Sequence, residues 1–276
     1  MLAPLPADPL SPAALLSDPE PEHHYVQLYD ADEELLIDNV GRYLAEGLSR
    51  GQDALVIAAP DHRAGFIRSL ESLGVDVAAA ERERRAAFLD AKETLAKFMV
   101  AGSPDAVLFD NVVRAAARRL ASGGVRASVR GYGEMVGLLW EAGQVQPAVA
   151  LEALWNRLLA DTGYTLFCAY HIDIFGAEFD MSAVDAVLCA HTHLLPGGRE
   201  GLLESAMERA LHEVFGSKLE GLRLLMKANF RPAWAIVPKP EAIILWLRRN
   251  LPDRADDVLA RARRHYLAAQ SGAACS

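Results

Sequence analysis

The first two thirds of the chain combine two hydrophobic patterns. Segments in which apolar and polar residues alternate are typical of β-strands, and a short unbroken apolar run is typical of a buried parallel strand. Four segments fit one of these patterns: His23–Tyr29, Asp53–Pro60, Arg126–Arg130 and Thr165–Tyr170. We expect each of them to form a strand.

Between these segments, apolar residues recur at the three- and four-residue spacing of a helix face. The acidic residues after Tyr29 cap a helix that runs to Ser49, and Asp90 with Glu93 forms a capping box. The segment Ser103-Pro-Asp105 predicts another helix start, with proline in the first helical position. Further helices are expected over Phe66–Leu73, Met135–Trp140, Gln146–Ala160 and Ser182–Cys189. This alternation predicts an α/β fold, a three-layer sandwich around a mostly parallel sheet.

The segment Arg126–Trp140 joins a strand pattern to a helix pattern. The alternation is interrupted at Gly131-Tyr-Gly133 and a helix face resumes at Met135, which predicts a glycine-rich turn between them. Ligand sites of α/β proteins lie at such turns, because the helix start has free N–H groups and the strand opens onto a crevice. Four side chains are candidates for ligand binding there: Arg130, Tyr132, Glu134 and Trp140. Alternatively, the helix dipole alone favours Glu134, and Trp140 is a core residue.

Three further residues flank the predicted strands and are also candidates for ligand binding. Tyr29 ends the first strand and His24 lies near its start, while Tyr170 ends the Thr165–Tyr170 strand. The carboxyl ends of parallel strands face the same crevice, so these side chains can line one opening. Their alternative interpretation is as ordinary surface or edge residues.

The residues after Pro196-Gly-Gly198 have a different character, because every pattern beyond this point is helical. Four helices are expected: Leu202–Phe215, Ser217–Ala228, Pro240–Arg249 and Arg254–Ala269. We therefore divide the chain into a proline-rich disordered arm (1–22), an α/β domain (23–196) and a helical C-terminal region (200–276). The apolar face of the first C-terminal helix can pack on the α/β domain, on a second copy of the chain or on a protein partner.

Composition and charge narrow the class of protein. The 276 residues are 51% hydrophobic and 24% charged, an ordinary globular profile, and no apolar run approaches the roughly 20 residues of a membrane helix. The net charge is −9, with a balance of +6 from Lys218 onward that leaves −15 for the residues before it. An acidic α/β domain is a poor nucleic-acid binder. The three cysteines do not have the regular spacing of a disulfide framework, and the N-terminus lacks a signal-peptide pattern. Both features favour a cytoplasmic protein.

A group of cysteines and histidines lies late in the α/β domain. These residues are candidate ligands of zinc or another soft metal: Cys168, His171, Cys189, His191 and His193. Their spacing is not that of an established zinc motif, so we expect no cofactor. A Cys–His nucleophile pair is the catalytic alternative, but the nucleophile-elbow motif is missing. Cys168 lies in an apolar strand, where cysteine is more often a small buried hydrophobe.

Several segments, taken in order, resemble those of the MEDS domain, a sensory domain named from methanogens, methylotrophs and the regulator DcmR. The similar segments are His24-Tyr-Val-Gln-Leu-Tyr-Asp30, Leu44-Ala-Glu-Gly-Leu-Ser-Arg-Gly51, Arg130-Gly-Tyr-Gly-Glu-Met135, Leu139-Trp140 and Leu151-Glu-Ala-Leu-Trp-Asn156. The resemblance implies a ligand-sensing module of bacterial and archaeal signalling proteins, including regulators of transcription, for small organic or hydrocarbon-derived molecules. It also implies a core similar to that of KaiC and RecA-type ATPases.

The loop after the first strand tests this implied nucleotide-binding ancestry. A P-loop needs glycines and a lysine to hold phosphates, whereas Asp30-Ala-Asp-Glu-Glu34 has four carboxylates in five residues. Like charges would repel a polyphosphate, so we expect no ATPase activity.

The sequence therefore predicts a non-catalytic cytoplasmic sensor of a small organic molecule. Aromatic side chains would form the walls of its pocket, and Arg130 and Glu134 would orient the ligand. Two alternatives stay open. One is a regulator that binds a protein partner, or a second copy of itself, through the C-terminal helices; the other is an enzyme that uses Glu134 as a general base.

Overall fold

A computed structural model shows the arrangement of the chain. It describes residues 12–30, 33–120, 128–176, 181–199, 201–229 and 236–273.

Six parallel strands form the central sheet of the protein. They are β1 (His24–Tyr29), β2 (Asp53–Ala58), β3 (Ala86–Asp90), β6 (Val129–Gly133), β7 (Thr165–His171) and β8 (His193–Leu195). Their order across the sheet is β3-β2-β6-β7-β1-β8, and each neighbouring pair is parallel. The predicted α/β fold with a parallel sheet is confirmed.

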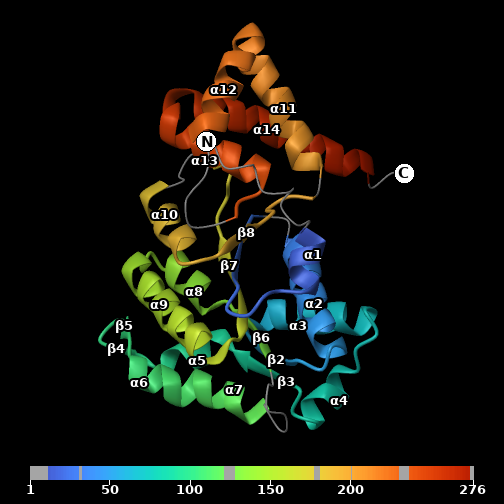
Figure 1. Cartoon of the computed structure of the whole chain (residues 1–276), viewed down its shortest axis with the longest axis vertical. Coiled ribbons are helices and arrows are strands. Elements are labelled where there is room, and N and C mark those ends of the chain that lie inside the picture. The colour runs from blue at the N-terminus through green and yellow to red at the C-terminus, as the bar shows by residue number, and fades with distance from the viewer. Residues whose placement is uncertain are drawn as a thin grey trace, which may run out of the picture.

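Helices cover both faces of this sheet, as Figure 1 shows. One face packs against α1 (Pro12–Ser17), α2 (Glu33–Ser49), α3 (Pro60–Ser72) and α4 (Val77–Arg82). The other packs against α5 (Ala91–Ala96), α6 (Ala106–Phe109), α7 (Ala115–Leu120), α8 (Met135–Glu141), α9 (Val145–Thr162) and α10 (Met181–Cys189). Each face has its own buried apolar cluster, so side chains that alternate along one strand enter different cores.

The C-terminal region forms a group of helices at one end of the α/β part (Figure 1). They are α11 (Leu202–Phe215), α12 (Leu219–Asn229), α13 (Lys239–Asn250) and α14 (Pro252–Ala273), so the helical pattern is confirmed. The apolar face of α11, with Leu203, Met207 and Leu211, is buried, and α11 lies along α14. The face that could have served a partner is thus covered by the chain itself. None of the described helices combines the length and the apolar composition needed to cross a membrane.

The prediction of a turn at Gly131–Gly133 is wrong, because both glycines belong to β6. A Cβ on Gly131 would lie 3.0 Å from the Leu166 side chain, and one on Gly133 would lie 3.2 Å from Trp155. The glycines therefore serve close packing within and beneath the sheet. The change from strand to helix takes a single residue, Glu134, which is the N-cap of α8.

Two short strands of the central sheet, β3 and β8, were not predicted. The five residues of β3 follow a charged helix end, and the three residues of β8 follow the end of α10 too closely to show an alternating pattern. The predicted helix start at Ser103-Pro104 is also wrong. These two residues form β5, which pairs with β4 (Met99–Val100), and the helix begins after Asp105, whose side chain accepts a hydrogen bond from Leu108 N.

The N-terminal arm is ordered over residues 12–22, in contrast to the predicted disorder; residues 1–11 lie outside the described part. Leu15 and Leu16 of α1 are buried against the apolar cluster that contains α2. The Arg130 guanidinium donates hydrogen bonds to the carbonyl oxygens of Leu16 and Ser17, at 2.7 and 2.9 Å. The carbonyl oxygens at the C-terminal end of this short helix have no partner within the helix, and the buried guanidinium supplies their hydrogen bonds.

Candidate functional site

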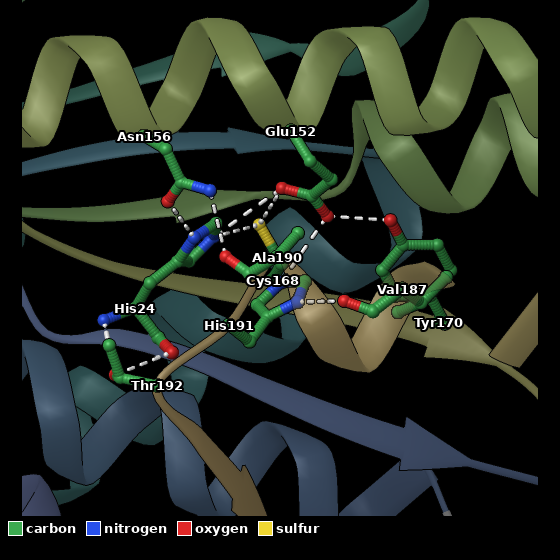
Figure 2. Close-up of polar contacts among 9 residues, drawn as sticks. All are labelled: His24, Glu152, Asn156, Cys168, Tyr170, Val187, Ala190, His191 and Thr192. Carbon is green, nitrogen blue, oxygen red and sulfur yellow. Dashed lines mark hydrogen bonds and ion pairs between the residues drawn. The ribbon is translucent and has the colours of Figure 1, made fainter. Parts of the chain in front are cut away.

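Four metal-ligating side chains meet beneath one face of the sheet. His24 is the first residue of β1, and Cys168 lies in the adjacent strand β7 on the same face. Glu152 reaches them from α9, and His191 from the connection between α10 and β8 (Figure 2). All four residues are buried, with Glu152 and Cys168 fully inaccessible to solvent. Segments distant in sequence therefore converge on one closed point.

The four side chains face one another at similar separations. His24 Nε2 lies 3.3 Å from Cys168 Sγ and 3.5 Å from Glu152 Oε2. Cys168 Sγ lies 3.8 Å from Glu152 Oε2, and His191 Nε2 lies 3.3 Å from Glu152 Oε1. One ligand atom from each residue falls within 4.8 Å of all the others, so the group has the dimensions of a metal site.

A second layer of hydrogen bonds holds these side chains in place (Figure 2). Asn156, one turn after Glu152 on α9, accepts a hydrogen bond from His24 Nδ1 at 2.8 Å and donates one to Ala190 O. His191 Nδ1 donates to Val187 O at 2.7 Å, and the Tyr170 hydroxyl donates to Glu152 Oε1 at 2.6 Å. With Nδ1 protonated on both imidazoles, each Nε2 faces the centre of the group.

Burial and nearby groups determine the ionisation of this cluster. Burial and the neighbouring His191 lower the pKa of His24 to about 3, despite the opposing charge of Glu152, so its imidazole is neutral at pH 7. Burial, reinforced by Glu152, raises the pKa of Cys168 well above its usual value. A thiol that is neutral and inaccessible is a poor nucleophile for a soluble substrate.

A second cluster lies at the carboxyl ends of the strands. Glu134 Oε1 accepts a hydrogen bond from His62 Nδ1 at 2.7 Å, and Glu134 Oε2 accepts one from Ala59 N at 2.8 Å. Ala59 is the N-cap of α3, so the Glu134 side chain serves the start of α3 and not that of its own helix. The ring of Tyr29 packs between those of His62 and His171, with centroids at 5.7 and 5.3 Å.

The hydrogen bond with Glu134 favours the protonated form of His62. Burial alone would lower the pKa of His62, but the hydrogen bond and charge of Glu134, with the charge of Glu33, outweigh it and raise that pKa. Beside this pair, burial raises the pKa of Tyr29 and of Tyr132, and Glu134 adds to both effects. Among the described residues, the Tyr132 hydroxyl has no hydrogen-bond partner.

Arg130 lies away from Glu134, at the opposite end of the same strand. Its guanidinium donates to Gln52 Oε1 and to Tyr43 O, each at 2.7 Å, in addition to its bonds with α1. It also stacks over the Tyr43 ring at 5.1 Å. With 1% of its surface exposed, Arg130 anchors α1 and α2 to the sheet.

The sheet separates the other predicted ligand-binding residues into two groups. Tyr29, Tyr132 and Glu134 lie together near the carboxyl ends, on the face covered by α2 and α3. His24 and Tyr170 lie on the opposite face, and the ring of Trp140 meets that of Tyr170 edge-on at 5.6 Å. These seven residues therefore do not surround one ligand.

The predicted metal ligands are divided in a similar way. Cys168 and His191 enter the buried cluster, but His171 is exposed at the carboxyl end of β7, Cys189 is exposed, and His193 packs against His23. Sequence reasoning missed Glu152 and assigned His24 to another site. One signal was present, because Glu152 is a charged residue on the apolar face of α9 beside Leu151 and Trp155.

A cleft with a volume of about 620 Å³ lies where the C-terminal helices meet the sheet. Leu28 and Ile172, at the carboxyl ends of β1 and β7, form one wall, and Tyr266 and Leu267 of α14 form the other. Charged groups around it are paired. Arg263 contacts Asp30 at 3.0 Å and Asp173 at 2.9 Å, and Arg199 contacts Glu34 at 3.2 Å.

Comparison with known proteins identifies the α/β part. The family described as the MEthanogen/methylotroph, DcmR Sensory domain (MEDS) matches residues 23–192, which is more than half of the chain. The chain belongs to the MEDS family. Membership in a family of sensory domains indicates a sensing or regulatory role. None of the curated proteins matches the chain.

The MEDS match has a clear relation to the two candidate sites. It extends from β1 to the connection before β8 and so includes all four residues of the buried cluster. The cleft, in contrast, has one wall in the matched part and one in α14, beyond the match. The cleft therefore lies between the MEDS domain and the C-terminal helices.

Proposed function

We propose that this MEDS protein is a non-catalytic sensor that binds a small, uncharged organic molecule in the cleft between the MEDS domain and α14. The position of the cleft is the observation that supports this proposal. A ligand that contacts both walls stabilises the arrangement in which they are close, and this differential stabilisation is what a sensor requires.

The walls of the cleft favour an apolar ligand. Leu28, Ile172, Ile174 and Phe175 line it from the strand ends, and Leu202 from α11. The positive charge of Arg263, at the edge of the cleft, is already paired with Asp30 and Asp173. A charged ligand would therefore have to displace one of these ion pairs. A volume of about 620 Å³ is in the range of roughly 300–1,000 Å³ typical of small-molecule sites.

The surroundings of two residues support a non-catalytic role. Both carboxylate oxygens of Glu134 accept hydrogen bonds within the protein, which opposes its use as a general base. The Cys168 thiol is fully buried, which opposes its use as a nucleophile.

A homologous series of straight-chain alcohols, from methanol to octanol, tests the proposed site on the full chain. Each ligand competes with a neutral solvatochromic dye such as Nile red. If the cleft binds apolar groups, each added methylene strengthens binding by about 0.8 kcal/mol, roughly fourfold, until the cleft is full.

A matched pair of variants locates the binding. Leu267→Trp adds bulk at the cleft, and Leu225→Trp adds the same bulk on α12; both leucines are more than half exposed. We expect Leu267→Trp to remove saturable binding and Leu225→Trp to retain it. Equal binding by the two variants, or affinity that does not depend on chain length, would contradict the proposal.

A further inference from the structure

The separations within the buried His24–Glu152–Cys168–His191 cluster match those of ligands around one metal ion. Tetrahedral ligands at about 2.0–2.3 Å from a zinc-like ion lie roughly 3.3–3.8 Å from one another. Among His24 Nε2, Cys168 Sγ and Glu152 Oε2, the three separations are 3.3, 3.5 and 3.8 Å, and His191 Nε2 lies 3.3 Å from the other oxygen of Glu152, Oε1. One ligand atom from each of the four residues lies within 4.8 Å of the others, so the group has the dimensions of a coordination shell.

A second histidine–glutamate pair in the same protein provides a contrast. His62 and Glu134 meet at 2.7 Å, the distance of a charge-assisted hydrogen bond. In the buried cluster, Glu152 stays 3.3 Å from His191 and 3.5 Å from His24, although all three side chains are within van der Waals reach. A charge-assisted hydrogen bond would be shorter than these separations, whereas the ligand atoms of one shared ion lie at such distances.

The outer hydrogen bonds orient the lone pairs toward the same centre. Carbonyl oxygens of Asn156 and Val187 accept the Nδ1 protons of His24 and His191, which leaves both Nε2 lone pairs directed inward. Among the described residues, His191 Nε2 has no hydrogen-bond partner, although the side chain has no exposed surface. Metal-bound histidines are oriented in this way by carbonyl or carboxylate partners of their other nitrogen.

We propose that His24, Glu152, Cys168 and His191 bind one divalent metal ion of the zinc class. Binding of the ion displaces the Cys168 thiol proton to solvent, so the resulting thiolate and the Glu152 carboxylate supply two negative charges that balance the ion, and the imidazoles bind as neutral ligands. Four protein ligands close the coordination sphere, so the ion has a structural role. It joins β1, β7, α9 and the connection before β8, and none of its four ligands lines the cleft in which the organic ligand is proposed to bind.

Metal analysis of the full chain tests this site directly. The protein is purified without chelator, its metal content is measured, and the chelator-treated protein is then titrated with Zn²⁺ and with Co²⁺. We expect one equivalent per chain, a higher melting temperature on metal uptake, and a thiolate-to-cobalt charge-transfer band in the Co²⁺ complex. Wild-type protein that takes up neither ion, or a Co²⁺ complex without that band, would overturn the proposal.

Matched variants separate this site from other metal-binding groups. Cys168→Ser and His191→Asn should lose the bound ion, and Cys189→Ser and His193→Asn should keep it, because those two residues lie outside the cluster. Asn156→Ala should weaken binding by about 10–100-fold through loss of the bond that orients His24. Metal uptake that is unchanged in Cys168→Ser, or lost equally in Cys189→Ser, places the ion elsewhere.

The wild-type cobalt spectrum keeps the test decisive if a ligand variant fails to fold. That measurement uses only the natural chain and reports the thiolate ligand without any substitution. Because the cleft variants leave this cluster intact, failure of the alcohol-binding experiment does not affect the metal result.

Discussion

Glu134 and Glu152 are both buried carboxylates that face histidines, but their partners are arranged differently. Glu134 is satisfied by one close imidazole and one backbone N–H. Glu152 faces two imidazoles and a thiol at longer distances and has one close donor, the Tyr170 hydroxyl. In the first arrangement both carboxylate oxygens accept hydrogen bonds within the protein, and the second arrangement is the group of side chains to which we assign a metal ion.

The His62–Glu134 pair should make stability depend on pH. Because the folded-state pKa of His62 is raised, its contribution is fully present below its unfolded value of about 6.5 and is lost as pH rises through the folded value. In Glu134→Gln the partner charge is removed and burial dominates, so the pKa of His62 should fall below 6.5. Titration of the His62 ring by NMR measures both values. An unchanged pKa in the variant would contradict the assigned pair.

The predicted positions of the site residues were right for Tyr29 and Glu134 and wrong for Arg130. Tyr29 and Glu134 were predicted to lie near one another at the carboxyl ends of the strands, and they do, because parallel strands bring these ends together. Arg130 was grouped with them by proximity in sequence. Along an extended strand, however, four residues span about 13 Å, which places Arg130 with α1 and α2.

At the scale of elements, glycines allow α8 to pack closely on β7. A Cβ on Gly137 would lie 2.8 Å from Ala169 O, whereas one on Gly221 of α12 would meet nothing within 4 Å. Gly137→Ala should therefore cost about 1–3 kcal/mol of stability, and Gly221→Ala should gain about 0.5–1 kcal/mol through helix propensity. Chemical denaturation measures both changes. If both substitutions changed the free energy of unfolding in the same direction, the close contact at Gly137 would not explain the effect.

The docking of α13 depends on a buried acid. Glu241 Oε1 accepts a hydrogen bond from Gly197 N at 2.9 Å, and burial raises the pKa of Glu241 to about 7. A raised carboxyl pKa means that the protonated acid favours folding, so stability should decline as pH rises from about 4.5 through 7.

Glu241→Gln separates this effect from that of His62, which acts in the same direction. The amide keeps an acceptor for Gly197 N and cannot ionise, so the decline in melting temperature between pH 5 and 8 should become smaller. The double variant with His62→Asn should remove most of the remaining slope. If Glu241→Gln leaves the pH profile unchanged, the acid does not titrate in this range.

Helix ends and long helices were predictable because their signals are local. Asp90 caps α5 as predicted, through a hydrogen bond with Glu93 N, and the α11 pattern matches Leu202–Phe215 throughout. The strands β3 and β8 are too short to show the hydrophobic alternation that is typical of a strand. Gly131 and Gly133 were read as a turn because glycine in a strand is explained only by the neighbours that need its space, here Leu166 and Trp155.

At the scale of the whole molecule, both candidate sites depend on contacts between distant segments. The buried cluster joins residues 24 and 191, and the cleft joins the strand ends to α14. Cys168 and His191 were predicted as candidate metal ligands because cysteine and histidine are the usual ligands of zinc. Sequence reasoning could not select His24 and Glu152 as their partners, because that choice depends on sheet order and on the packing of α9.

The central claim is that ligand binding in the cleft couples the MEDS domain to the C-terminal helices. Hydrogen exchange of the full chain, followed by mass spectrometry with and without saturating octanol, tests it most directly. We predict slower exchange in α14 and at the carboxyl ends of β1 and β7 in the wild type, and no such change in Leu267→Trp. Octanol binding that leaves α14 exchange unaltered, or that slows it equally in Leu267→Trp, would contradict the account.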